Sequence, residues 1–167
     1  MQQLSGQDAM FLHAELDGLP QHIGGVSIYD QSTAPGGRVR FKQILAMLES
    51  RLHLSPIFRR KLAFVPLNLG RPYWVEDPKF SLDDHLKHVS LPPPSNWESF
   101  CKQVSQLHSQ PLDLSRPVWE MYLIDGLDES PMAPKGSFAV MSKVHHGALD
   151  DATDEEFTHA LHDESKP

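Results

Sequence analysis

Two adjacent histidines near the end of the chain, His145 and His146, are the strongest candidates for chemistry, and a carboxylate, Asp150, follows five residues after the first. An imidazole titrates near neutral pH, so it can take a proton from a hydroxyl group and return it. A nearby carboxylate can fix the tautomer of a histidine or hold a turn through an ion pair. Because the chain has ten histidines, the pair alone is a weak motif, and two ordinary structural histidines remain an equally good interpretation.

The residues around the pair predict how it is positioned. An apolar run at 138–141 leads into it, and an acidic segment with helix-start signals, 150–156, leads out. This pattern predicts a buried strand that ends at the histidines, then a turn and a helix. Successive side chains of a strand point to opposite faces. We therefore expect one histidine to be the reactive group and the other to pack or brace the turn.

Periodicity along the rest of the chain predicts a sheet layered with helices, an α/β (α+β layered) fold. Two glycines, Gly24 and Gly25, lie inside one predicted strand, where glycine often marks the close approach of another group. The predicted helices span residues 4–16, 41–52 and 97–108, with a last one from 153. The predicted strands span residues 22–29, 62–65, 73–75, 119–124 and 137–145.

Composition limits the function classes. The chain has 167 residues, enough for one domain, and a net charge of -7, which argues against a nucleic-acid partner. The single cysteine, Cys101, excludes an internal disulfide and falls on the apolar side of a predicted helix, so we expect a buried thiol. The sequence shows no secretory signal and no apolar run near the roughly 20 residues of a membrane span. These features predict a cytoplasmic protein.

Five stretches carry a resemblance to a known family. The segment 111–120 is close to a Pro-Leu-Asp…Ser-Arg-Pro-Leu-Trp-Glu signature, and 145–151 resembles His-His-x-x-x-Asp-Gly. Three more stretches, 4–12, 21–25 and 56–62, precede them. In their order along the chain, the five resemble the N-terminal half of bacterial wax ester synthase/diacylglycerol acyltransferases. That family belongs to the chloramphenicol-acetyltransferase-like superfamily. The resemblance implies a mixed sheet packed with helices, with residues 1–167 as the N-terminal acyltransferase domain and the C-terminal half absent from this chain.

The resemblance also implies a reaction. His146 matches the family's general base, which would deprotonate a long-chain alcohol or a diacylglycerol for attack on the thioester of an acyl-CoA. The products would be wax esters or triacylglycerol. His145 would support the turn, and Asp150 would be structural or orienting. The expected partners are acyl-CoA, the acyl acceptor, the C-terminal half, membrane or lipid-droplet surfaces, and a second copy in a homo-oligomer. No metal and no cofactor are expected, since acyl-CoA is a substrate.

Three residues are candidates for the walls of the substrate channel, again by resemblance. They are Pro117, Trp119 and Gly147.

Two departures from the family pattern lead to further expectations. Asp151 stands where the family has glycine, and its negative charge should raise the pKa of the neighbouring base and lower activity relative to a glycine variant. The chain is also less than half as long as family enzymes, in which the channel lies between two halves. We therefore expect little turnover from this chain unless a second half or a partner completes the channel.

Two other functions stay open. A catalytically impaired acyltransferase-like domain could serve as a self-associating or partner-binding module, held by exposed apolar surface. A metal site is the other, because two further histidines at i, i+3 spacing share one helix face near the pair. Its ligands would be His145, His146, Asp150, His159 and His162.

Overall fold

The structure is a computed structural model that describes residues 1–16 and 18–149. The helices are α1 (Gly6–Leu16), α2 (Phe41–Arg51) and α3 (Trp97–Ser109). The strands are β1 (Gln2–Gln3), β2 (His22–Tyr29), β3 (Arg60–Ala63), β4 (Tyr73–Glu76), β5 (Leu86–Ser90), β6 (Trp119–Asp125) and β7 (Phe138–His145).

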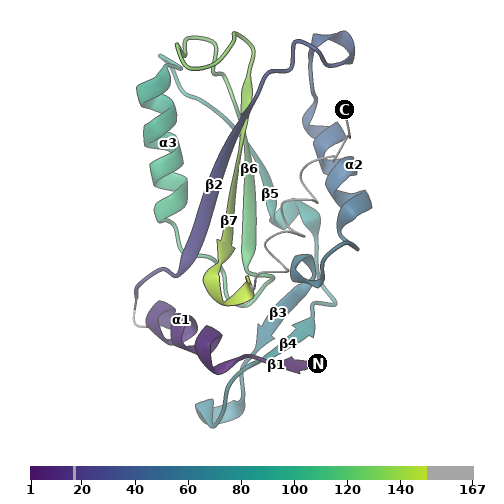
Figure 1. Cartoon of the computed structure of the whole chain (residues 1–167), viewed down its shortest axis with the longest axis vertical. Coiled ribbons are helices and arrows are strands. Elements are labelled where there is room, and N and C mark those ends of the chain that lie inside the picture. Colours follow the sequence, from purple (N-terminus) through teal and green to yellow (C-terminus); the bar gives the residue numbers. More distant parts are fainter. Residues whose placement is uncertain (17, 150–167) are drawn as a thin grey trace.

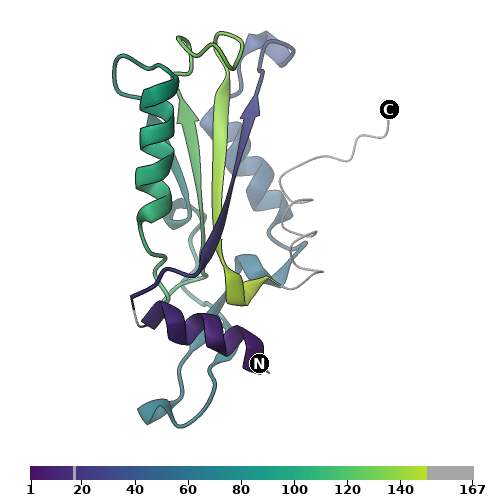
Figure 2. The same cartoon turned by 60° about the vertical axis from the view of Figure 1, so that its left-hand side comes forward.

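The larger sheet has four strands in the order β2-β7-β6-β5, and it is mixed. β7 pairs antiparallel with both β2 and β6, whereas β5 and β6 run parallel. Helix α3 covers one face of this sheet and α2 covers the other, which gives three layers (Figures 1 and 2). The mixed sheet packed with helices that the sequence predicts is therefore confirmed.

Strand β6 shows why the sheet is covered on both faces. Its side chains alternate between two clusters, as the two-residue period of a strand requires. Trp119 and Met121 pack with Leu48 of α2, whereas Tyr122 and Ile124 pack on the α3 side. A strand buried on both faces has an almost continuously apolar sequence, and β6 and β7 have this character.

A smaller sheet, in the order β1-β4-β3, lies with α1 at one end of the molecule (Figure 1). Helix α1 starts at a capping serine, because the hydroxyl of Ser5 accepts a hydrogen bond from the backbone N–H of Asp8 at 3.1 Å. Ala9 and Leu12 of α1 are buried against Leu62 and Val118. This packing places α1 beside the end of β7.

Several predictions need correction. The sequence analysis missed β5, because Lys87 and His88 interrupt the apolar alternation of this strand. The predicted strand 62–65 begins earlier, at Arg60. The thiol of Cys101 is exposed rather than buried, because α3 packs on the sheet mainly through Phe100 and Leu107. The predicted last helix, from residue 153, lies outside the described residues.

No helix within residues 1–16 and 18–149 has both the length and the apolar character needed to cross a membrane.

Candidate active site

The two histidines stand where β7 ends and a single 3-10 turn, His146–Ala148, begins. Backbone hydrogen bonds hold this junction from both sides. The N–H of His145 donates to the carbonyl of Val118 at 2.9 Å, and the N–H of His146 donates to the carbonyl of Gln21 at 2.8 Å. The end of the strand is therefore fixed to both of its neighbours, so the directions of the two side chains are fixed too.

His145 is buried, with 1% of its surface exposed, and it stabilises the turn. Its Nδ1 accepts a hydrogen bond from the backbone N–H of Gly147 at 3.0 Å. The proton of the neutral ring is therefore on Nε2. Burial lowers the pKa of His145, which favours this neutral form, although the charge of Glu15 acts in the opposite direction.

His146 has the opposite environment. Its side chain is exposed, and its ring stacks on Phe11 of α1, with 4.0 Å between the ring centroids and 9° between the planes. The stacking fixes the plane of the imidazole, and the ring nitrogens have no hydrogen-bond partner among residues 1–16 and 18–149. The sequence analysis placed Phe11 in the apolar stripe of α1, and no local sequence pattern pairs it with a histidine 135 positions later.

Gly147 is needed at this turn because α1 comes very close to it. A Cβ atom at this position would lie 3.1 Å from the carbonyl oxygen of Asp8 and 3.2 Å from Nδ1 of His145. Both neighbours are held in place, one by the helix backbone and the other by its own hydrogen bond to the turn. Glycine therefore lets α1 and the histidine turn pack together.

A pocket of about 280 Å³ adjoins the turn. The turn contributes Gly147, Ala148 and Leu149, and the opposite side comes from α1 and the small sheet. The remaining lining residues are Gln2, Gln3, Ser5, Asp8, Pro56, Ile57, Arg60 and Trp74. Gly147 thus lines a cavity beside the histidines, and its role in a substrate channel stays a prediction.

The other two channel candidates lie deeper. Pro117 is buried, and Trp119 is fully buried at 0% exposure. The indole N–H of Trp119 donates to the carbonyl of Phe58 at 3.1 Å, and its ring stacks on His85. Neither residue lines the pocket beside the turn. Their role in a channel stays a prediction.

Asp150 and Asp151 lie outside the described residues, so the position of the motif carboxylate stays a prediction as well. The same holds for the metal site of the sequence analysis, three of whose five ligands, Asp150, His159 and His162, are also outside. Within the described ranges no cluster of three metal-ligating side chains occurs.

A buried cation that the sequence analysis did not single out supports the strand behind the histidines. Lys143 has no exposed side-chain surface, and its ammonium group lies 3.4 Å from Glu120 on β6. It also donates to the backbone carbonyls of Leu107 and Gln110 at the end of α3, at 3.0 and 2.8 Å. Burial lowers the pKa of Lys143, while Glu120 acts to raise it. Lys143 thus ties α3 to the strand that carries the histidines.

The close approach expected at the strand glycines occurs at Gly24. A Cβ atom there would lie 2.8 Å from the ring of His108 on α3. That ring meets the ring of His22 edge-on at 4.7 Å between centroids, and Nε2 of His22 donates to the carbonyl of His108 at 2.6 Å. His108 itself is exposed. The glycine therefore allows the end of α3 to lie against β2, near the histidine turn.

Comparisons with known proteins identify the family and the fold of this chain. The profile of the wax ester synthase/diacylglycerol acyltransferase catalytic domain matches residues 4–166. A Mycobacterium tuberculosis protein named "Probable diacyglycerol O-acyltransferase" is 31% identical over 163 residues, which cover 98% of this chain and 57% of that protein. A second protein of that bacterium, also named for this activity, is 37% identical over 150 residues, 90% of this chain and 30% of its own length.

Solved structures show the same fold. The wax ester synthase/diacylglycerol acyltransferase of Marinobacter aquaeolei VT8 aligns with a TM-score of 0.74 and 30% identity, over 93% of this chain and 37% of that one. A condensation domain of the calcium-dependent antibiotic synthetase aligns with a TM-score of 0.69 at 15% identity, which shows the fold alone. This chain thus spans about a third to just over half of the length of these relatives. It belongs to the wax ester synthase/diacylglycerol acyltransferase catalytic domain family.

Proposed function

We propose that this chain carries the base-bearing part of an acyl-CoA-dependent O-acyltransferase that makes wax esters or triacylglycerol. The observation that supports this most is the division between the two histidines. His145 is buried and bonded to the turn, while His146 presents a ring that is held by stacking but open to another molecule. A general base needs this combination of fixed orientation and access.

The proposed reaction transfers an acyl group from sulfur to oxygen. His146 takes the proton of the acceptor hydroxyl as its oxygen attacks the thioester carbon, and a tetrahedral oxyanion forms. The oxyanion collapses, the carbon–sulfur bond breaks, and the proton on His146 passes to the leaving CoA thiolate. The ester and free CoA are the products, and no acyl-enzyme is formed. The acceptor is a long-chain alcohol or a diacylglycerol, as the names of the relatives suggest.

The proposal includes a second part of the channel. The pocket beside the turn has about 280 Å³, which is less than the usual range of about 300–1,000 Å³ for ligand sites. Long-chain substrates need more room than this. We propose that the region corresponding to the rest of the longer relatives completes the channel and, with it, contact with a membrane or lipid-droplet surface.

Substitution of His146 tests the proposal. The chain would replace the matching part of the Marinobacter enzyme in a chimera, and release of free CoA would be measured with a long-chain alcohol. His146→Ala should lower kcat by about 10²–10⁴-fold, the usual contribution of a general base. His53→Ala, at another exposed histidine, should leave kcat unchanged. Equal activity of the two variants, or a folded chimera with no turnover before substitution, would contradict the proposal.

The role of Asp151 is tested in the same chimera. Because a nearby negative charge disfavours the neutral, proton-accepting form of an imidazole, Asp151→Gly should raise turnover at neutral pH. Asp151→Asn removes the charge but keeps the size, so it separates electrostatics from turn geometry. No gain in either variant would argue against an inhibitory effect of this residue.

A self-associating module is the second candidate, and the edge strand β2 favours it. β2 has a partner on one side only within the described sheet, and it exposes Ile23, Val26 and Ile28 by 47%, 43% and 37%. An exposed apolar edge is a ready surface for pairing with another chain. If the chain associates this way, Val26→Lys should shift it to monomer in size-exclusion chromatography, whereas Met132→Lys, in an exposed connector, should not. A monomeric parent chain would exclude this function.

A further inference from the structure

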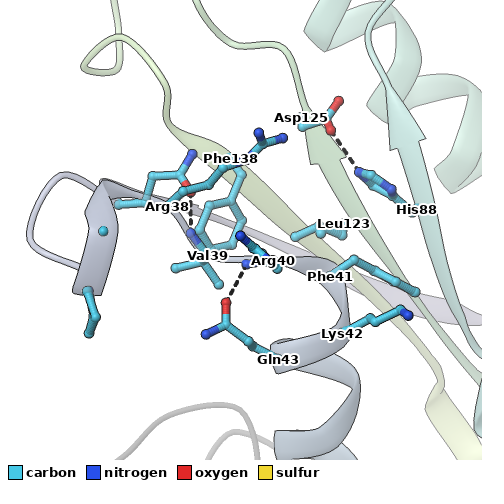
Figure 3. Close-up of a pocket in the computed structure, with 13 residues that line it drawn as sticks. Arg38, Val39, Arg40, Phe41, Lys42, Gln43, His88, Leu123, Asp125 and Phe138 are labelled. Atoms are coloured by element: carbon cyan, nitrogen blue, oxygen red, sulfur yellow. Dashed lines mark hydrogen bonds and ion pairs between the residues drawn. The ribbon is translucent and has the colours of Figure 1, made fainter.

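A second, larger pocket lies on the α2 side of the main sheet, at the far end from the histidine turn. Its volume is about 890 Å³. One wall is the segment 38–42, where the chain enters α2, and the other is the ends of β5, β6 and β7 (Figure 3). β7 runs from Phe138 at this pocket to His145 at the turn, seven steps of about 3.3 Å or roughly 23 Å. The pocket is therefore separate from the candidate active site.

Three cations gather at this pocket. Arg38, Arg40 and Lys42 all line it and are all exposed, and none of them has an ion-pair partner among the residues that the structure describes. The one carboxylate in the lining, Asp125, lies 2.8 Å from Nε2 of His88. In a chain with a net charge of -7, this local excess of positive charge stands out and favours an anionic ligand.

The cationic segment is held in place rather than loose. The backbone N–H of Val39, between the two arginines, donates to the side-chain oxygen of Gln31 at 2.6 Å, and the Gln31 amide donates in turn to the carbonyl of Gly136. The backbone N–H of Arg40 donates to the side chain of Gln43 at 2.7 Å. The helix that begins at Phe41 adds the positive end of its dipole on the same side.

The floor of the pocket is apolar and aromatic. Phe41 stacks on His88 with 5.3 Å between the ring centroids, and Leu123 and Phe138 continue this surface (Figure 3). Small-molecule sites commonly combine such a floor with a few polar groups, in volumes of about 300–1,000 Å³. The pocket is within this range and far larger than a bare inorganic anion needs. Its ligand should therefore have an organic body as well as a charge.

We propose that this pocket binds an organic phosphate, with the phosphate group on the cationic segment 38–42 and the organic body over Phe41 and Phe138. Arginine forks match phosphate oxygens in pairs, and charge-assisted hydrogen bonds of this kind are among the strong ones. A soluble nucleotide-type phosphate ester and the headgroup of an anionic phospholipid share this chemistry. The proposal does not depend on the acyltransferase reaction, because it uses no residue of the histidine turn.

Binding to the 167-residue chain tests it, with the two sources as separate arms. One arm titrates adenosine 3′,5′-bisphosphate, with inorganic phosphate as competitor. The other measures co-sedimentation with phosphatidylcholine vesicles that contain or lack phosphatidylglycerol. The test variant is Arg38→Gln/Arg40→Gln/Lys42→Gln. The control, Lys79→Gln/Lys102→Gln/Lys135→Gln, removes the same charge from exposed positions elsewhere. Circular dichroism verifies that both fold.

In at least one arm, the pocket variant should bind about tenfold or more weakly than the parent, while the control and His146→Ala bind like the parent. The arm that shows this loss identifies the source of the phosphate. No saturable binding in either arm, or equal loss in both triple variants, would overturn the proposal. Amide chemical shifts of the parent give a reading that needs no variant. Changes centred on residues 38–43 support the site, and changes confined to other segments contradict it.

Discussion

At the residue scale, the candidate site depends on one close contact, between the turn after the histidines and the first helix. Gly147 lies against the backbone of Asp8. A Cβ atom at position 147 would lie only 3.1 Å from the carbonyl oxygen of Asp8. The N–H of Gly147 also fixes the tautomer of His145. The glycine thus links the position of α1, the form of one imidazole and the presentation of the next.

Gly147→Ala should therefore destabilise the fold. The added methyl group meets backbone on one side and a bonded ring on the other, and overpacking of this kind costs about 1–3 kcal/mol in the free energy of unfolding. Urea denaturation followed by circular dichroism measures it. Gly25→Ala is the control, because its Cβ would meet only the hydroxyl of Ser142 at 3.7 Å, an ordinary contact. Equal effects of the two substitutions would show that the contact with α1 is not the cause.

At the scale of elements, the buried Lys143 is the main polar connection between α3 and β7. Its ammonium group satisfies two carbonyls at the end of α3 and lies beside Glu120, whose Oε2 also accepts from the hydroxyl of Tyr122 at 2.5 Å. The hydrogen bonds from Tyr122 and Lys87 help to lower the pKa of Glu120 against the effect of burial. Helix α3 and strands β5, β6 and β7 therefore share one charged network.

Lys143→Met should cost about 1–3 kcal/mol in the free energy of unfolding, because two carbonyls at the end of α3 lose their buried donor, while Glu120 keeps its hydrogen bonds from Tyr122 and Lys87. A double-mutant cycle with Glu120→Gln isolates the ion pair. The double variant should lose less than the sum of the two single variants. Strict additivity would mean that the carboxylate and the ammonium group do not stabilise each other.

At the scale of the whole molecule, buried neutral histidines should make the fold sensitive to mild acid. Burial is the main cause that lowers the pKa of His85 and of His145 below 6.5. Below about pH 6.5 the unfolded chain binds protons that the folded chain does not, so the free energy of unfolding falls as the pH falls. Carboxylates with lowered pKa, such as Asp77, add their effect only at lower pH.

Thermal unfolding between about pH 7.5 and about pH 5.5 checks this. Tm should fall as the pH is lowered across this window, and His85→Gln should flatten the slope because glutamine does not titrate. Glutamine can still donate to the carbonyl of Trp119, which Nδ1 of His85 reaches at 2.8 Å, so the variant should keep this contact. The exposed His53→Gln should leave the slope unchanged. A Tm that does not vary with pH in this window would contradict the predicted effect of the buried histidines on stability.

The sequence predicted elements well where one periodicity dominates. The strand 22–29 is observed with the same bounds, and the amphipathic pattern from Phe41 becomes α2. Strand β5 was missed because Lys87 and His88 interrupt its apolar alternation. At the site, alternation along the strand predicted that the two histidines would have different environments. The contacts with Phe11 and Asp8 could not be predicted, because they arise from packing between segments far apart in the chain.

The dependence of kcat/KM on pH, in the chimera that carries this chain, tests the central claim most directly. If the imidazole of His146 accepts the proton of the acyl acceptor, activity should fall on the acid side as that ring becomes protonated. His146→Ala should remove both most of the activity and this acid limb. An acid limb that persists unchanged in His146→Ala, at undiminished turnover, would contradict the account.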